Sequence, residues 1–590
     1  DATVNGVTVG KGANSVSTNT VLGVTALDAA TTGANNTAVG SNSLTANTTG
    51  EKNTAIGAGA LQANTTADRN VAVGMNCLQQ NTTGADNVAM GTGSMDANVT
   101  GSNNVAVGHN ALMSSTGASN NVAVGYQALD ANTTGTDNVG VGYGALTDNT
   151  TGIQNTAVGL NCLANNTTAD NNTAVGRNAM VANTTGAQNT AMGVFALDAN
   201  TTANSSTAIG FQSLSANTTG AENTAAGAYS MVTNTTGTKN AALGAYSLRF
   251  NTTGDFNTAA GYQALTANTT ADNNTAFGYN TLQANTTGTQ NTAVGALALD
   301  AVSTASYNSA FGYSALGANT TGAENCAFGQ SSLLSNTTGN YNTAYGSASL
   351  AYVTTGSNNT AFGRYSLLQV VSGSENTAYG NSSLQNNTAS GNTAVGYQTL
   401  QANTSGTLNT GIGLNALDAN QTGEGNTAAG ANALTDNTGH SNTAIGNRAS
   451  YQNTTGRDNV AVGNNSLNAN TTSNYNTAVG SYALYDNTAA NNVAVGYQAL
   501  YENTTGDKNT GIGAYALNLT TTGANNTAVG AQALDANQTG EKNTAVGSNA
   551  LGSNTVSENT AIGYYALSNN TTGTTNTAVG VQCMHQTTTS

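Results

Sequence analysis

The chain has 590 residues and a formal net charge of −16, with 27 acidic and 11 basic residues, 71 glycines and no proline. So few lysines and arginines among so many carboxylates argue against binding to nucleic acid or to an anionic membrane surface. Charged residues form only 6% of the chain, against roughly a quarter in ordinary domains, so asparagine, threonine and serine must provide the solubility.

The first 18 residues, DATVNGVTVGKGANSVST, do not follow the pattern of the rest of the chain, and we expect residues 1–18 to form an N-terminal cap. A short phrase then recurs, as in NVAVGYQALDANTTG from Asn121. The glycine after the apolar residues returns every 17 residues from Gly23 to Gly580, with four intervals of 16 among the 33. A repeat of this kind predicts a stacked, repetitive architecture.

We number the positions of the repeat from 1 to 17, so that Asn121 is position 1 and Asp137 is position 17. Position 4 is apolar, and position 9 is Leu or Met in all repeats except one, which has Ser450. Two short apolar segments between Asn/Thr/Gly turns favour strands, because a helix needs ten or more residues with a period of 3.6. We predict an all-β fold, a parallel β-solenoid (β-roll) of about 33 coils with a 17-residue repeat, each coil having two strands and two turns.

The repeat also predicts which side chains face the interior. We expect positions 4 and 9 to point inward, as in Val124, Leu129, Val141 and Leu146, with NTTG at a corner, because all four one-residue deletions fall there. Position 3, for example Ala123, is Ala or Gly after the first repeat. It lies on the opposite strand face from position 4, so we expect it to face outward and to stay small because a second chain packs against it. Position 5 is always Gly, which indicates a positive φ or a very close contact.

We predict one repeat domain over residues 19–580, followed by a partial coil at 581–590. The chain starts at Asp1 rather than at methionine and ends within a coil, so we expect a piece of a longer or processed product. No apolar run approaches the roughly 18 residues that span a bilayer, and no signal peptide is visible. We therefore expect no membrane insertion by this segment.

The sequence predicts no catalytic, cofactor-binding or metal-ligating residues, and no cofactor. His109, His440 and His585 are far apart in the repeat array, so we interpret them as scattered surface residues. The cysteines replace small residues at positions 8 and 2, and we expect packed thiols or, alternatively, a bridge between chains: Cys77, Cys162, Cys583 and Cys326.

The asparagines of NTT, such as Asn47, Asn132 and Asn251, have the form of glycosylation sites. A glycan on every coil would need to fit a spacing of ~4.8 Å, which is less than the width of a sugar. We therefore favour a ladder of turn asparagines, which tolerate left-handed backbone and cap their own loops.

Two sets of aromatic residues recur in columns. Tyrosines at position 6 either point outward, where they could stack on sugars of a host surface, or fill gaps inside: Tyr126, Tyr143, Tyr262, Tyr279, Tyr313, Tyr397, Tyr497 and Tyr564. Position 4 becomes aromatic in one zone, where we expect a locally thicker core rather than a pocket: Phe277, Phe311, Phe328, Tyr345, Phe362 and Tyr379.

The apolar-Ala-apolar-Gly core of the coil, as in Val71-Ala72-Val73-Gly74 and Val122-Ala123-Val124-Gly125, resembles the YadA-like head repeats of trimeric autotransporter adhesins and related phage tail-fibre repeats. The resemblance extends from Asn19 to Gly580. It implies a left-handed parallel β-roll of three chains that serves adhesion or forms a fibre shaft. The 17-residue unit is longer than the typical repeat of that family, and no anchor, coiled-coil stalk or C-terminal chaperone domain is visible, which favours the phage-type fibre.

These observations predict a non-enzymatic, extracellular structural fibre, either a viral tail-fibre shaft on the virion surface or a bacterial surface adhesin. We expect a parallel homotrimer and a glycan or protein receptor. Ice binding is a remote alternative, since the adjacent threonines at positions 13 and 14 would point to opposite sides rather than form one face. A polysaccharide lyase or hydrolase would need clustered carboxylates or basic residues on neighbouring coils, and the sequence shows none.

Overall fold

A computed structural model describes residues 1–589 of the chain. The fold is all-β, a parallel β-solenoid of about 33 turns with a 17-residue repeat, as predicted. The coils form two compact units, Asp1–Ala296 and Leu297–Ser590, and each is described by itself. Among the residues described, no helix has the length and apolar character needed to cross a membrane.

The first unit begins with a short hairpin. Strands β1 and β2 are antiparallel, and β2 also pairs antiparallel with β3, the strand of the first coil. A 3₁₀ turn, η1 (Ala13–Ser15), follows the hairpin. From β3 to β19, consecutive strands of this unit pair in parallel, one strand from each coil. The strands of the unit are β1 (Ala2–Val4), β2 (Val7–Gly10), β3 (Thr20–Gly23), β4 (Thr37–Val39), β5 (Thr54–Ile56), β6 (Val71–Val73), β7 (Val88–Met90), β8 (Val105–Val107), β9 (Val122–Val124), β10 (Val139–Val141), β11 (Thr156–Val158), β12 (Thr173–Val175), β13 (Thr190–Met192), β14 (Thr207–Ile209), β15 (Thr224–Ala226), β16 (Ala241–Leu243), β17 (Thr258–Ala260), β18 (Thr275–Phe277) and β19 (Thr292–Val294).

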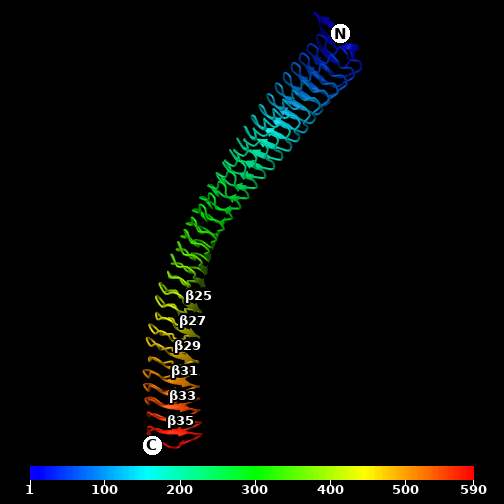
Figure 1. Cartoon of the computed structure of the whole chain (residues 1–590). Helices are drawn as coiled ribbons and strands as arrows, with labels where there is room; N and C mark the ends of the chain where they lie inside the picture. Colours follow the sequence, from blue (N-terminus) through cyan, green and yellow to red (C-terminus); the bar gives the residue numbers. More distant parts are fainter. Residues whose placement is uncertain (590) are drawn as a thin grey trace. The chain divides into compact units, whose positions relative to one another are not determined.

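The second unit repeats the same coil, and Figure 1 shows its strands from β25 to β35 following one another in chain order. Residue 590, the last of the expected partial coil 581–590, lies outside the described residues. The strands of this unit are β20 (Ser309–Phe311), β21 (Cys326–Phe328), β22 (Thr343–Tyr345), β23 (Thr360–Phe362), β24 (Thr377–Tyr379), β25 (Thr393–Val395), β26 (Thr410–Ile412), β27 (Thr427–Ala429), β28 (Thr443–Ile445), β29 (Val460–Val462), β30 (Thr477–Val479), β31 (Val493–Val495), β32 (Thr510–Ile512), β33 (Thr527–Val529), β34 (Thr544–Val546), β35 (Thr560–Ile562) and β36 (Thr577–Val579).

Each repeat has a single strand, so the prediction of two strands per coil is wrong. The strand covers positions 2–4, and in the first repeat it extends to Gly23 at position 5. Positions 7 and 9 have left-handed backbone, as in Gln127 (φ 53°) and Leu129 (φ 55°). This conformation folds the segment into successive turns, because a strand requires extended residues with negative φ. NTTG lies outside the strands and bends at its two threonines, in agreement with the predicted corner.

Hydrogen bonds join neighbouring coils in the turns as well as in the strands. The Leu129 N–H donates to the Ala145 carbonyl at 2.9 Å, and the Thr133 N–H donates to the Thr150 carbonyl at 2.9 Å. The Thr133 hydroxyl donates to the same Thr150 carbonyl at 3.0 Å. The inter-coil ladder therefore continues through segments that are not strands, which satisfies the backbone groups that the left-handed turns would otherwise leave unpaired.

The core of each coil is narrow and combines apolar residues with asparagine. Positions 3, 8 and 9 are fully buried, as in Ala123, Ala128 and Leu129, and Leu146 is buried in the next coil. The inward direction predicted for Leu129 and Leu146 is confirmed. The direction predicted for position 4 is wrong, because Val124 and its equivalents lie half-exposed on the outer face of the strand.

Position 3 is small because it packs against residues of its own chain. The expectation that position 3 faces outward, with a second chain packed against it, is wrong. A Cβ placed on Gly140, which occupies position 3, would lie 3.3 Å from Cγ of Leu129 in the preceding coil and 3.3 Å from the Ala145 carbonyl. One methyl group fits this contact, and any larger side chain would displace the leucine. Because position 3 faces inward, position 4 must face outward.

Two asparagine ladders complete the core. At position 1, the Asn138 N–H donates to Oδ1 of Asn121 (3.0 Å), and Nδ2 of Asn138 donates to the Gly152 carbonyl (2.8 Å). At position 12, Nδ2 of Asn149 donates to Oδ1 of Asn132 (2.9 Å) and to the Gly152 carbonyl (3.0 Å). All four asparagines are buried. Each ladder pairs polar groups that would be costly to bury alone.

Candidate functional site

The outer face of the strands carries a half-exposed apolar column at position 4. Its aromatic zone does not thicken the core, so that prediction is wrong. In the second unit the rings stack from coil to coil, with centroid separations of 4.5 Å for Phe311–Phe328, 4.4 Å for Phe328–Tyr345, 4.6 Å for Tyr345–Phe362 and 5.4 Å for Phe362–Tyr379. Each ring within the stack has its faces covered by the rings of the neighbouring coils. The column therefore presents mainly ring edges to its surroundings.

The position-6 tyrosines point outward, which decides between the two directions that the sequence left open. The eight tyrosines named from the sequence are 42–54% exposed. Some form short stacks: Tyr126 lies 5.4 Å from His109 and 5.0 Å from Tyr143, centroid to centroid. These rings are accessible side chains on the coil surface and do not fill gaps.

A denser aromatic group lies in the second unit, where Tyr482, Tyr485, Tyr497, Tyr501 and Tyr515 contact one another; we call it the tyrosine cluster. Sequence inspection by column identified only Tyr497, because the others occupy positions 7 and 10. Comparing positions 6, 7 and 10 of adjacent coils together would have found the group.

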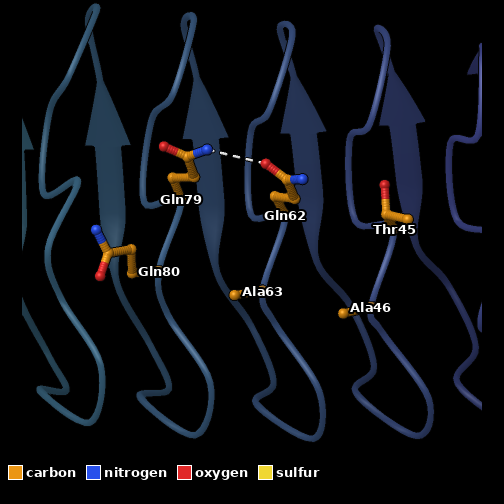
Figure 2. Close-up of a pocket in the computed structure, with 6 residues that line it drawn as sticks. All are labelled: Thr45, Ala46, Gln62, Ala63, Gln79 and Gln80. Atoms are coloured by element: carbon orange, nitrogen blue, oxygen red, sulfur yellow. Dashed lines mark hydrogen bonds between the residues drawn. The ribbon is translucent and has the colours of Figure 1, made fainter.

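A surface groove crosses three coils of the first unit at positions 10 and 11 (Figure 2). It has a volume of about 410 Å³ and is lined by Thr45, Ala46, Gln62, Ala63, Gln79 and Gln80. Nε2 of Gln79 donates to Oε1 of Gln62 at 2.9 Å, so part of the polar lining is paired with itself. This lining is neutral and contains no side chain with the acid–base properties of a catalytic group.

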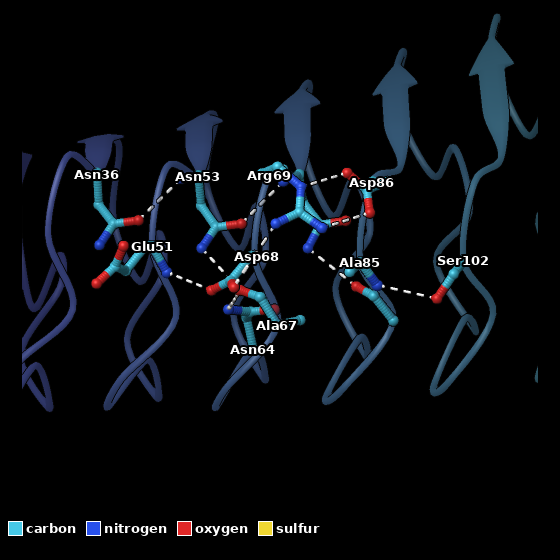
Figure 3. A network of polar contacts seen from close by, with 12 residues as sticks. Asn36, Glu51, Asn53, Asn64, Ala67, Asp68, Arg69, Ala85, Asp86 and Ser102 are labelled. Carbon is cyan, nitrogen blue, oxygen red and sulfur yellow. Dashed lines mark hydrogen bonds and ion pairs between the residues drawn. The ribbon is translucent and has the colours of Figure 1, made fainter.

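A polar network at the corner formed by positions 15, 16, 17 and 1 contains the main ion pair of the first unit (Figure 3). Arg69 donates to both carboxylate oxygens of Asp86, at 2.5 and 2.7 Å. The Glu51 N–H donates to Oδ1 of Asp68 at 2.7 Å, and the Ala85 N–H donates to Oγ of Ser102 at 3.1 Å. Hydrogen bonding to Arg69 lowers the pKa of Asp86. The network joins consecutive coils and gives this corner a structural role.

The three histidines lie in separate environments. His109 stacks on Tyr126, and Nδ1 of His440 accepts a hydrogen bond from the Glu424 N–H at 3.1 Å. Nδ1 of His585 lies 2.5 Å from Oγ of Ser568. No carboxylate within residues 1–589 hydrogen-bonds to His585, so this contact lacks the third group that orients a histidine base in a nucleophilic triad.

The cysteines do not form disulfides within the described part of the chain. Cys77 and Cys162 are fully buried, and burial raises the pKa of each thiol to about 12. Their thiols therefore stay protonated and unreactive at neutral pH. Cys326 and Cys583 are half-buried.

The NTT asparagines form the ladder expected from the sequence. Asn47, Asn132 and Asn251 are buried, and Nδ2 of each donates to the carbonyl of the glycine three residues later, at 3.0–3.1 Å. Nδ2 is the atom that would carry a glycan, and in the folded coil it is enclosed and hydrogen-bonded. The ladder and a glycan array are therefore incompatible in the same folded coil.

No group of three or more His, Cys, Asp and Glu side chains in residues 1–589 is arranged to hold a metal ion. No protein-family model and no curated protein matches the chain. The candidate functional surfaces are the exposed aromatic and apolar ones, namely the position-4 column, the outward tyrosines and the tyrosine cluster.

Proposed function

We propose that this chain is a non-enzymatic structural protein, the shaft of an extracellular fibre of the phage tail-fibre kind. The supporting observation is the near-identity of the coils, which share the same buried positions and inter-coil hydrogen bonds. Each additional coil adds one strand spacing of ~4.8 Å and preserves the local structure. Regular addition of length is what a fibre shaft requires.

We further propose that the shaft is a parallel homotrimer, associated through position 4 rather than position 3. Tyr345, Phe362 and Tyr379 are 40%, 36% and 59% exposed. At about 200 Å² for each aromatic residue, these three leave roughly 270 Å² uncovered. Copies in register would bring each position-4 side chain against its equivalents and cover the column in many coils. The number of three chains comes from the resemblance to trimeric fibre repeats.

Light scattering of the full chain after gel filtration tests the assembly. A trimer has about three times the 58.4 kDa of one chain. Replacing Phe328 and Tyr345 by serine should shift the mass towards that of one chain, because both side chains lie outside the coil and in the proposed interface. Tyr313→Ser, at the exposed position 6, is the matched control. A monomeric wild-type chain would refute the trimer.

Immunogold labelling tests the fibre function. Antibodies against the chain should label the tail fibres of intact phage particles. Labelling of bacterial cell surfaces without virions would assign the chain to an adhesin instead. Labelling confined to the cell interior would refute an extracellular fibre of either kind.

A further inference from the structure

The tyrosine cluster combines stacked and tilted rings over three consecutive coils. Tyr485 and Tyr501 stack with centroids 5.2 Å apart and planes 8° apart. The Tyr482 ring is tilted by 53° to Tyr485 and 59° to Tyr501, at centroid separations of 5.6 and 6.3 Å. Tyr497 meets Tyr482 edge to face at 6.5 Å and Tyr515 at 5.4 Å. Three of the rings, Tyr482, Tyr485 and Tyr501, thus lie within 6.3 Å of one another, centroid to centroid.

Two carboxylates flank these rings. Asp486 and Glu502 follow Tyr485 and Tyr501 at position 11, and both are half-buried. Neither takes part in an ion pair within residues 1–589. Burial raises the pKa of Tyr501, and the negative charge of Asp486 raises it further, with a smaller contribution from Glu502. Each carboxylate directly follows one ring of the stacked pair in the chain, so both lie beside the cluster.

Elsewhere in residues 1–589, six of the 31 phenylalanine and tyrosine rings have one of the chain's own cations over them. Five of its 11 lysines and arginines lie over a ring at 4.3–5.4 Å from the centroid: Arg177 on Phe195, Lys239 on Phe256, Arg249 on Tyr246 and Phe250, Arg364 on Tyr365, and Arg448 on Tyr451. In the part of the chain that the structure describes, no lysine or arginine lies over a ring of the tyrosine cluster. The cluster thus has negative ring faces and two negative side chains without an internal cation.

We propose that the tyrosine cluster binds an organic ammonium group, of the quaternary type carried by choline. Ring faces attract such a cation through their quadrupole, and its methyl groups pack on the rings. Asp486 and Glu502 supply the opposite charge in a partly desolvated setting, where charge attraction is stronger than in water. A neutral sugar could use the ring faces, but it would not benefit from the two negative charges. This site does not depend on the proposed fibre function.

Saturation-transfer NMR with tetramethylammonium and the full chain tests the site. The methyl signal should receive saturation from the wild-type protein, and Tyr482→Ala and Tyr501→Ala should each reduce it at least fivefold. Tyr126→Ala is the matched control, because Tyr126 is an exposed, stacked tyrosine in the first unit, and it should leave the signal unchanged. An equal loss in the control would refute a specific site.

Two comparisons keep the test valid if the alanine variants fold poorly. Glu502→Gln preserves shape and removes charge, and it should weaken binding about threefold. Neopentyl alcohol, a neutral analogue with a quaternary carbon in place of the nitrogen, should bind more weakly than tetramethylammonium. Absence of transfer to tetramethylammonium, or transfer to a neutral methyl glycoside that alone depends on Tyr482, would overturn the ammonium site, the second result by assigning a sugar platform.

The same chemistry could reach the site from a surface polymer or from a lipid headgroup, and two further assays separate these sources. Retention on choline-substituted agarose without pelleting on phosphatidylcholine vesicles would assign a polymer-borne group. Pelleting on the vesicles would assign the lipid. Failure of the wild-type chain to bind either support would contradict the proposal.

Discussion

A methyl group added at position 5 would collide with the backbone of the next coil. At Gly125 the added Cβ would lie 2.2 Å from the Gly142 carbonyl oxygen, and φ is +141°, a conformation that L side chains rarely adopt. We expect Gly125→Ala to lower the local opening free energy by about 3 kcal/mol or more. The strain of the positive φ and the collision of the methyl group with the next coil both destabilise the closed state. Hydrogen exchange of amides 120–145 measures this loss. Tyr126→Ala is the control, and equal protection in both variants would contradict the explanation.

Ser450 is the exception to the leucine and methionine column at position 9. It is buried, and its hydroxyl has no hydrogen-bond partner within residues 1–589. Its φ of 50° equals that of Leu467 in the next coil, so the backbone already suits leucine. We expect Ser450→Leu to stabilise this coil by about 2 kcal/mol through apolar burial and removal of the unpaired hydroxyl.

Hydrogen exchange of residues 443–470 checks the effect of Ser450→Leu. Ser466→Leu is a matched control from position 8, where the native hydroxyl is bonded to the Gly463 carbonyl at 3.0 Å and the space is filled. The control should destabilise the coil through overpacking. Slower exchange with Ser466→Leu, or faster exchange with Ser450→Leu, would show that the interior differs from the one described.

At the scale of the element, the stability of a coil depends on the inward face of its strand and on one buried leucine. Leu129→Ala should lower the opening free energy of its coil by about 2–5 kcal/mol, because a buried leucine is lost and a cavity remains. Val124→Ala should change the opening free energy of the separated chain by less than about 1 kcal/mol, because Val124 is half-exposed. Hydrogen exchange below the concentration of assembly compares the two. A larger effect at Val124 would restore the original prediction that position 4 faces inward.

At the scale of the whole molecule, carboxylates at position 10 make stability depend on pH. Burial raises the pKa of six of them: Asp96, Asp130, Asp198, Asp300, Asp418 and Asp535. A raised folded-state pKa means that the folded chain binds these protons more tightly than the unfolded chain does. Their stabilising contribution is therefore complete below the unfolded value of about 3.9 and is lost as pH rises through the folded values.

We therefore expect the melting temperature to rise as pH falls from 7 towards 4, as measured by circular dichroism. Asp86 acts in the opposite direction, because Arg69 lowers its pKa and this contribution is lost in acid. It is one exposed group against the six aspartates at position 10 and Asp486 at position 11, whose pKa burial also raises. Changing all six aspartates to asparagine should raise the melting temperature at pH 7 and flatten its dependence on pH. The matched control is Asp86→Asn, which should do neither, and a wild-type chain that melts lower at pH 4 than at pH 7 would contradict the prediction.

The sequence alone determined the period, the all-β class, the parallel solenoid, the corner at NTTG and the constraint at position 5. These features follow from comparing the repeats within one chain, because each position of the repeat has the same surroundings in every coil and so keeps the same type of residue. The burial of Leu129 also follows from its constant apolar character.

Only the tertiary structure decided which side of the strand faces inward. A three-residue strand offers two choices of face, and exchanging them moves every side chain to the other side. The left-handed backbone at positions 7 and 9 places Leu129 inside, and its contact with position 3 then leaves room for a methyl group alone. Position 4 is consequently outside, with its aromatic column. The tyrosine cluster depended on structure for a related reason, because the turns bring positions 6, 7 and 10 of neighbouring coils together although they belong to different columns of the repeat.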